Sequence, residues 1–160
     1  MRRLILMRHG EAERPNAVVD DFDRSLDEAG RAESRRMGRA LAEAGFAPDL
    51  ALVSAARRTL ETWAGVAAAF ADDVAVEQSR GLYAASAVTL SAAVTEAAGR
   101  AQTIMLVGHN PGIHQYAAHL AQQAEAPRID RFPTGSAAVF AFDEDGQARL
   151  ETMLLARNLR

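Results

Sequence analysis

The sequence predicts an α/β fold, a three-layer α/β/α sandwich with a mostly parallel central sheet, helices on both faces and an antiparallel C-terminal edge hairpin. Short apolar segments alternate with longer, alanine-rich segments of helical periodicity, and this alternation is typical of a parallel sheet between helical layers. The last two apolar segments flank the turn sequence Asp143-Glu144-Asp145-Gly146, which is typical of a hairpin.

The first strand and the first helix have the clearest boundaries. The apolar run over residues 4–7 predicts a buried strand over residues 4–8, and the polar, Asp-rich segment 10–26 is expected to follow as a long loop. A loop of this length is unusual in a compact domain and is often functional. Asp27 is in a position to cap a helix over residues 28–44, which Gly45 ends.

The rest of the chain continues the alternation. Residues 50–53 predict a short strand, after which Ser54 is in a position to cap a helix over residues 55–70. The remaining expected elements are a strand over 74–77, a helix from Ser86 or Ala87 to residue 98, a strand over 103–107, a helix to residue 124 with Asn110 as cap and Pro111 in first position, and two strands over 136–142 and 149–155.

The bulk properties bound the class of protein. A chain of 160 residues can bury a sizeable core and predicts a single domain over residues 1–160. The net charge of -3 argues against a nucleic-acid partner, and the absence of cysteine excludes disulfides and thiolate chemistry. Because the first apolar run is too short for a signal peptide and no segment approaches a membrane span, we expect a cytoplasmic domain without a membrane partner. The oligomeric state is unknown from sequence.

Residues suited to phosphate chemistry follow three of the predicted strands. They are Arg8, His9 and Gly10 after the first strand, Ser54 with Arg57 and Arg58 after the second, and Gly108, His109 and Asn110 after the strand over 103–107. Histidine is a possible nucleophile, arginine is a bidentate phosphate ligand, and glycine lets the backbone approach an anion closely. Since ligands bind at the carboxyl ends of parallel strands, these groups predict one phosphate site.

Each residue taken singly also has an ordinary structural interpretation. His9 fits a hydrogen-bonded core histidine equally well, and Arg57 and Arg58 fit the solvated charges of a helix. His109 fits a structural residue at a strand–helix corner. The grouping of these residues, more than any one of them, favours a phosphate site.

Histidines and glycines of this kind also occur in metal sites and in nucleotide-binding loops. His109, His114 and His119 are spaced by five, which does not put them on one helical face, and no compact carboxylate–histidine motif accompanies them. We therefore expect no metal site. The chain has no lysine and no glycine-rich nucleotide loop, so phosphate binding must depend on arginine.

Four segments of the chain resemble the histidine phosphatase superfamily, also called phosphoglycerate mutase-like. They cover residues 6–12, 23–31, 53–62 and 107–112. Residues 132–136, Phe-Pro-Thr-Gly-Ser, are similar to the small bacterial SixA-type phosphohistidine phosphatases. The resemblance therefore extends over nearly the whole chain.

The resemblance implies a role for each matching residue. His9 would be the nucleophile and become phosphohistidine, Arg8 and Arg58 would bind the phosphoryl oxygens, and His109 would donate to the phosphoryl group. Arg24 matches the family's loop arginine and would reach the phosphate. Gly10 is expected beside the phosphate, and Arg57 is out of register with the motif.

The implied function is a phosphatase that works through a phosphohistidine intermediate without a cofactor. A SixA-like protein phosphohistidine phosphatase, acting on a phosphorylated protein or a similar small phospho-compound, is the leading hypothesis. The alternatives are a small-molecule phosphomonoesterase of the same superfamily and a non-catalytic phosphate-binding module.

The sequence offers no clear proton donor for a leaving group. Glu11, Asp21, Asp23 and Glu77 are candidates, and none stands out. An alkoxide leaving group needs a general acid, whereas the imidazole of phosphohistidine can be protonated on its remote nitrogen before it leaves. The missing donor therefore favours a phosphoramidate substrate over an alkyl ester.

Overall fold

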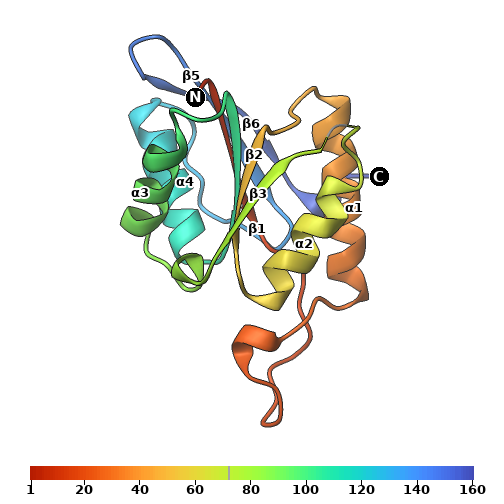
Figure 1. The fold of residues 1–160 in the computed structure, drawn as a ribbon. Helices are drawn as coiled ribbons and strands as arrows, with labels where there is room; N and C mark the ends of the chain where they lie inside the picture. The colour runs from red at the N-terminus through yellow and green to blue at the C-terminus, as the bar shows by residue number, and fades with distance from the viewer. Residues whose placement is uncertain (72) are drawn as a thin grey trace.

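The computed structural model describes residues 1–71 and 73–160, and its central feature is a six-stranded sheet in the order β3-β2-β4-β1-β5-β6 (Figure 1). The strands are β1 (Arg3–Arg8), β2 (Leu50–Ser54), β3 (Ala75–Ser79), β4 (Thr103–Gly108), β5 (Ala137–Phe142) and β6 (Ala148–Leu154). β3, β2, β4 and β1 are parallel, whereas β5 runs antiparallel to both β1 and β6. The predicted α/β class, with its mostly parallel sheet and antiparallel C-terminal hairpin, is confirmed.

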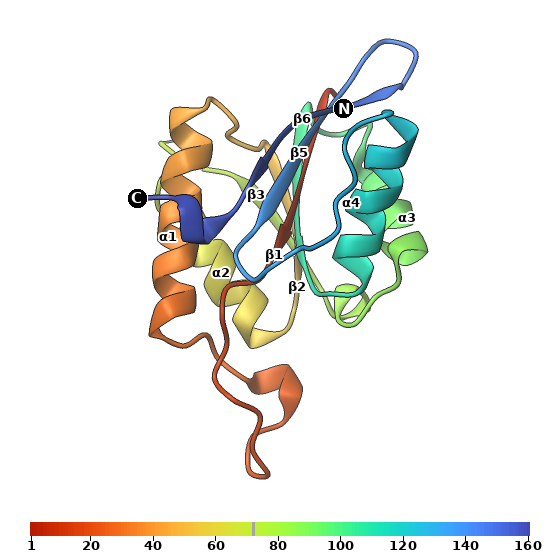
Figure 2. The ribbon, with the colours of Figure 1, turned by 180° about the vertical axis from the view of Figure 1, so that it is seen from behind.

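Two helical layers cover the sheet, α1 and α2 on one face and α3 and α4 on the other (Figures 1 and 2). The helices are α1 (Glu28–Glu43), α2 (Arg57–Ala67), α3 (Ala87–Ala97) and α4 (Gly112–Gln123). β1 is buried on both sides, because Leu4 and Leu6 join the core under α3 and α4 while Ile5 and Met7 join the core under α1 and α2. This two-sided burial explains why the strand is a continuous apolar run in the sequence.

The start of α1 lies directly against the end of β1. Asp27 caps the helix as predicted, and its Oδ1 accepts from the backbone N–H of Gly30 at 2.8 Å. A Cβ on Gly10 would lie 2.6 Å from the carbonyl oxygen of Gly30, and a Cβ on Gly30 would collide with the carbonyl oxygen of Glu11. The two backbones can approach this closely only because both positions are glycine.

Two predicted helix caps are wrong. Ser54 ends β2, and α2 begins only at Arg57 with Ala56 before it and no side-chain cap. The hydroxyl of Ser54 is instead bonded to His109. At α4, Pro111 takes the capping position. The Oδ1 of Asn110, the atom that would accept from a helix N–H, has no hydrogen-bond partner among the described residues, while the Nδ2 of Asn110 donates to the carbonyl oxygen of Phe132.

Two weaker expectations are also refined. β3 begins and ends later than predicted, and it is an exposed edge strand. The long loop over residues 10–26 projects from the end of the sheet where β1 finishes (Figure 1), yet it is ordered by an Ala12–Leu26 bridge and the short helix η1 (Asp21–Asp23). In the two described stretches of chain, no helix has the length and apolar character needed to cross a membrane.

We predict that Gly30→Ala lowers the free energy of unfolding by about 1–3 kcal/mol, because the added methyl group overpacks the contact with Glu11. Urea denaturation measures this loss. Gly99→Ala is the matched control, since a Cβ there meets nothing within 4 Å. Equal stability of Gly30→Ala and wild type would contradict the close approach of β1 and α1.

Candidate active site

The carboxyl ends of β1, β2 and β4 meet at a pocket of about 340 Å³. The register of β1 on β4 pairs Arg8 with Gly108, so His9 and His109 follow side by side, with ring centroids 5.3 Å apart. The pocket is lined by Arg8, His9, Glu11, Ala12, Asp21, Arg24, Arg58, Tyr83, Ala84, His109, Asn110 and Thr134. The structure thus brings together both histidines and all three arginines expected at the phosphate site.

His9 is held in one tautomer. The residue is 8% exposed, and its Nδ1 lies 2.7 Å from the carbonyl oxygen of Gly10. Because a carbonyl only accepts, Nδ1 carries the proton and Nε2 keeps a lone pair. That nitrogen accepts from Nε of Arg58 at 3.3 Å. His9 therefore presents an unprotonated Nε2 to the pocket.

The surroundings of His9 keep the imidazole neutral. The pKa of His9 is lowered to about 4, chiefly by burial and also by the positive charges of Arg58, Arg8 and Arg24, while the hydrogen bond to the Gly10 carbonyl acts in the opposite direction. At neutral pH the ring is uncharged, and it gains a proton only as the pH falls toward 4. A histidine nucleophile needs this neutral form.

His109 is neutral for similar reasons. Burial, the nearby His9 and the charge of Arg58 lower its pKa to about 3. Its Nδ1 lies 3.3 Å from Nη2 of Arg58, which can only donate, so Nε2 carries the proton toward the hydroxyl of Ser54 at 2.7 Å. To donate to a phosphoryl group, Nδ1 must take up a proton, and the negative charge of that group favours the uptake.

Arg58 is the most buried of the arginines in the pocket, at 5% exposure. Its Nε and Nη2 contact His9 and His109, while its Nη1 donates to the backbone carbonyl of Asp21 at 2.6 Å. Arg57 points elsewhere, exposed and paired with Glu61 at 2.9 Å. The preference for Arg58 over Arg57 as the pocket residue therefore agrees with the structure.

Arg8 has an unsatisfied donor. Its Nη1 donates to the carbonyl oxygen of Phe132 at 3.1 Å, but its buried Nε has no hydrogen-bond partner among the described residues. Burial lowers the pKa of Arg8. A buried donor without a partner costs free energy, and an anion in this pocket would supply the missing acceptor.

Arg24 lines the pocket but is committed to its own loop. Its Nη2 and Nε donate to Oδ1 of Asp21 at 2.8 and 3.2 Å, and its Nη1 donates to the carbonyl oxygen of Glu13 at 3.0 Å. Arg24 thus contributes positive charge to the pocket while two of its nitrogens are bound to a carboxylate.

Gly10 is not where the prediction put it. It does not line the pocket, and its N–H donates to Oγ1 of Thr62 at 3.0 Å instead of facing an anion. The glycine is required by the close crossing with Gly30, and its carbonyl serves His9. Its role is to position the site, which corrects the expected phosphate contact.

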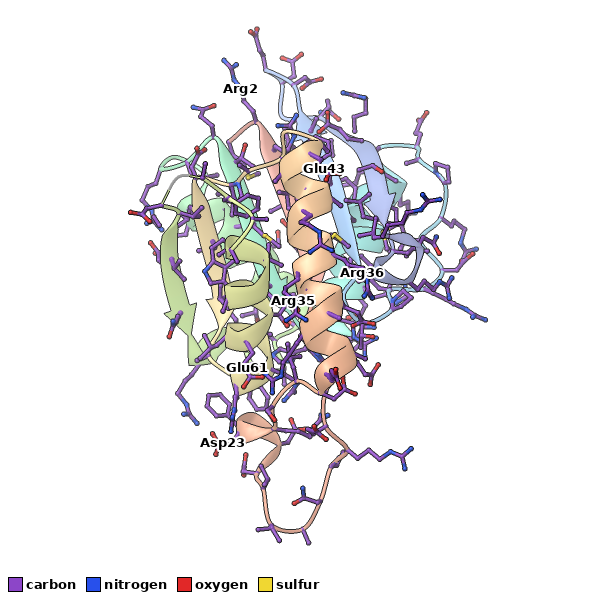
Figure 3. The ribbon with its side chains drawn as sticks, turned by 90° about the vertical axis from the view of Figure 1, so that its right-hand side faces the viewer. Arg2, Asp23, Arg35, Arg36, Glu43 and Glu61 are labelled. Carbon is purple, nitrogen blue, oxygen red and sulfur yellow. The ribbon has the colours of Figure 1, made fainter. Side chains whose placement is uncertain are left out.

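The carboxyl groups considered as proton donors lie in different places, and only some of them reach the pocket. Glu77 pairs with Arg100 on the exposed edge strand, away from the pocket. Asp23 faces an adjoining groove, and Figure 3 shows it on the loop beneath Glu61 of α2. Asp21 lines the pocket, but hydrogen bonds from Tyr83 and Arg24 hold its pKa well below the usual range, so it stays ionised.

Glu11 is the remaining carboxyl group of the pocket. Its Oε2 accepts from the hydroxyl of Thr134 at 3.1 Å, and its backbone N–H donates to Glu33. Thr134 and Tyr83 are pocket residues that the sequence analysis did not single out. Thr134 lies in the matched segment 132–136, which was a usable signal, whereas nothing in the sequence marks Tyr83.

The other two histidines lie outside the pocket. Nε2 of His114 is 2.7 Å from the carbonyl oxygen of Ile129, and His119 is exposed on α4. Within residues 1–71 and 73–160, no three histidine, aspartate or glutamate side chains are grouped so that they could hold a metal ion.

The class of protein follows from a family comparison. Residues 4–85, just over half of the chain, match the family model of the histidine phosphatase superfamily (branch 1). The chain belongs to this superfamily.

Within that class, the whole fold is similar to two SixA structures that are provisionally assigned as phosphohistidine phosphatases. SixA from Agrobacterium tumefaciens is 30% identical with a TM-score of 0.84, over 96% of this chain and 98% of that one. SixA from Nakamurella multipartitia is 26% identical with a TM-score of 0.83, over 96% and 95%.

Curated relatives match over a shorter segment. The 2,3-bisphosphoglycerate-dependent phosphoglycerate mutase of Leifsonia xyli subsp. xyli is 43% identical over 61 residues, which are 37% of this chain and 24% of that protein. Among the first curated relatives, the matching segment spans only 24% to 28% of their length.

We predict that Arg58→Ala raises the pKa of His9 from about 4 toward its ordinary value of 6.5, because the change removes a nearby positive charge and admits water. An NMR titration of the imidazole signals measures this shift. Arg57→Ala is the control and should leave the pKa of His9 unchanged. The same pKa in Arg58→Ala as in wild type would contradict the electrostatic account of the site.

Proposed function

We propose that this protein is a phosphatase that removes the phosphoryl group from a phosphohistidine side chain of another protein. The observation that carries the proposal is the neutral His9, whose Nε2 lone pair opens into a pocket lined by Arg8, Arg24 and Arg58. Such a pocket can both attack a phosphorus atom and compensate the charge on its oxygens.

The first step transfers the phosphoryl group to His9. Its Nε2 forms a bond to phosphorus while the P–N bond of the substrate breaks, and the substrate imidazole, already protonated on its remote nitrogen, leaves as a neutral ring. Arg58 and Arg8 hold the equatorial oxygens, which carry charge throughout the transfer. Arg58 releases Nε2 of His9 and donates to a phosphoryl oxygen instead.

The second step returns His9 to its starting state. Phospho-His9 carries its ring proton on Nδ1, bonded to the Gly10 carbonyl, and is therefore a good leaving group. Water attacks phosphorus, the bond from Nε2 to phosphorus breaks, and both protons of the water leave with dihydrogen phosphate. The proposed cycle uses side chains of this chain and water alone.

A phosphohistidine substrate agrees with the acid–base groups of the pocket. Asp21 stays ionised and supplies no proton to an alkoxide, so Glu11 is the one carboxyl group left for that task among the described residues of the pocket, while a protonated imidazole needs no proton from the enzyme. The similarity to SixA proteins supports the same substrate class.

A protein substrate agrees with the surroundings of the pocket. A groove of about 780 Å³ continues from the pocket along the projecting loop and shares Glu11, Ala12 and Arg24 with it. The groove leaves room for polypeptide beside a phosphorylated side chain. The loop exposes Val19, which lines this groove, and the neighbouring Val18.

A small-molecule phosphomonoesterase is the second candidate. The observation that favours it is the modest volume of the pocket, about 340 Å³, which is at the small end for ligand sites and suits a compact metabolite. Comparing kcat/KM for a phosphohistidine protein with that for sugar and nucleotide phosphates separates the two. A strong preference for one alkyl ester would overturn the proposed substrate.

We predict that His9→Ala abolishes hydrolysis of both a phosphohistidine protein and p-nitrophenyl phosphate, because it removes the attacking nitrogen. His109→Ala should lower kcat by about a hundredfold to a thousandfold through loss of one preorganised donor. Phosphate release measures both effects, and the exposed His119 provides the matched control His119→Ala, with wild-type rates expected.

Two outcomes would contradict this proposal. Wild-type turnover in His9→Ala would exclude His9 as the nucleophile. Binding of phosphate by the wild-type protein without turnover of any phosphorylated compound would identify a non-catalytic phosphate-binding module.

A further inference from the structure

One exposed loop residue contacts both Arg24 and Arg58 in the pocket. We propose that Asp21 is a positioning residue that orients Arg58 toward the phosphoryl group and links it to the projecting loop. The proposal rests on the proposed phosphatase function and adds a residue to which neither the sequence motifs nor the family comparison gives this role.

The oxygen atoms of Asp21 accept hydrogen bonds from three side chains, those of Arg24 in the same loop, Arg58 on α2 and Tyr83. Oδ1 accepts from Nη2 and Nε of Arg24 at 2.8 and 3.2 Å. Oδ2 accepts from Nη2 of Arg58 at 3.1 Å and from the hydroxyl of Tyr83 at 2.6 Å. The backbone carbonyl accepts from Nη1 of Arg58 at 2.6 Å. One residue thus connects three side chains from three separate segments.

These contacts fix which edge of Arg58 faces the reacting atoms. A guanidinium is planar and rigid, so holding one edge sets the direction of the others. Asp21 holds Nη1 and one side of Nη2, which leaves Nε and the other side of Nη2 directed to His9 and His109. A phosphoryl group that displaces those two weak contacts, each 3.3 Å long, finds the guanidinium already oriented.

The position of Asp21 is itself supported by aromatic packing. The ring of Tyr83 lies edge-on to Phe22 at 5.1 Å and edge-on to His109 at 5.5 Å. Arg80 stacks on Phe22 at 4.2 Å. Since Phe22 is the next residue along η1, this packing holds the short helix against the rim of the pocket although the Asp21 side chain is 47% exposed.

Asp21→Asn tests the proposal because it keeps the size of the side chain and removes its charge and one strong acceptor. We expect kcat/KM to fall by about 10- to 100-fold, the effect of losing a charge-assisted hydrogen bond that orients a catalytic group. The fall should be equal for p-nitrophenyl phosphate and phenyl phosphate. A larger loss with the poorer leaving group, phenyl phosphate, would show proton donation instead and would overturn the proposal.

A double-mutant cycle with Arg58→Ala separates positioning of Arg58 from a general effect on the loop. Once Arg58 is absent, Asp21→Asn should change kcat/KM, and the affinity for orthovanadate measured by calorimetry, by less than about twofold. Multiplicative losses in both quantities would overturn the proposal. The orthovanadate cycle needs no turnover, so it tests Asp21 even if the phosphatase proposal fails.

Asp23→Asn is the matched control. Asp23 lies in the same helical turn and is exposed, but it faces the adjoining groove and not the pocket. With p-nitrophenyl phosphate, which is too small to need the groove, Asp23→Asn should keep wild-type kcat/KM, and it should keep wild-type orthovanadate affinity. Equal losses in Asp23→Asn and Asp21→Asn would mean that the effect comes from the charge of the loop, and would contradict the proposal. If the wild-type enzyme turns over substrate in a way that requires His9, but Asp21→Asn has the same kcat/KM as wild type, the positioning role of Asp21 is refuted while the proposed phosphatase function stands.

Discussion

The short hydrogen bond from His9 Nδ1 to the carbonyl oxygen of Gly10 is the interaction on which the candidate site depends. It fixes the tautomer, and the tautomer decides which nitrogen can attack. The bond exists because the backbone of Gly10 is itself fixed, by its N–H to Thr62 and by the close crossing with Gly30. The contact between β1 and α1 in the fold therefore determines a chemical property of one side chain.

Positive charge is the second constraint on the site. Arg8 and Arg58 are buried or half-buried beside two histidines, an arrangement that burial alone would disfavour. Because both imidazoles are neutral, they add no charge that would repel the arginines. The carboxylate of Asp21, at the rim of the pocket, offsets part of the positive charge of Arg58. A phosphoryl dianion would complete the balance and would offer an acceptor to the Nε of Arg8, which has no hydrogen-bond partner among the described residues.

The sequence predicted the layers, the antiparallel C-terminal hairpin and the cluster of His9, Arg8, Arg58 and His109, because apolar periodicity and strand ends are local properties. The predictions from sequence were wrong where one side chain had two possible hydrogen-bond partners. The hydroxyl of Ser54 could cap a helix or bind His109, and the choice depends on a residue 55 positions away. The same long-range dependence hid Tyr83 and the role of Asp21, since their contacts form only between separate segments.

The central claim is that Nε2 of His9 carries the phosphoryl group during turnover. Rapid alkaline quenching of the enzyme with its substrate, followed by peptide mapping and ³¹P NMR, identifies both the phosphorylated residue and the nitrogen. The account predicts phosphorus on Nε2 of His9, because the Gly10 carbonyl occupies the Nδ1 side. Phosphorus on Nδ1, on His109, or on no residue during active turnover would contradict it.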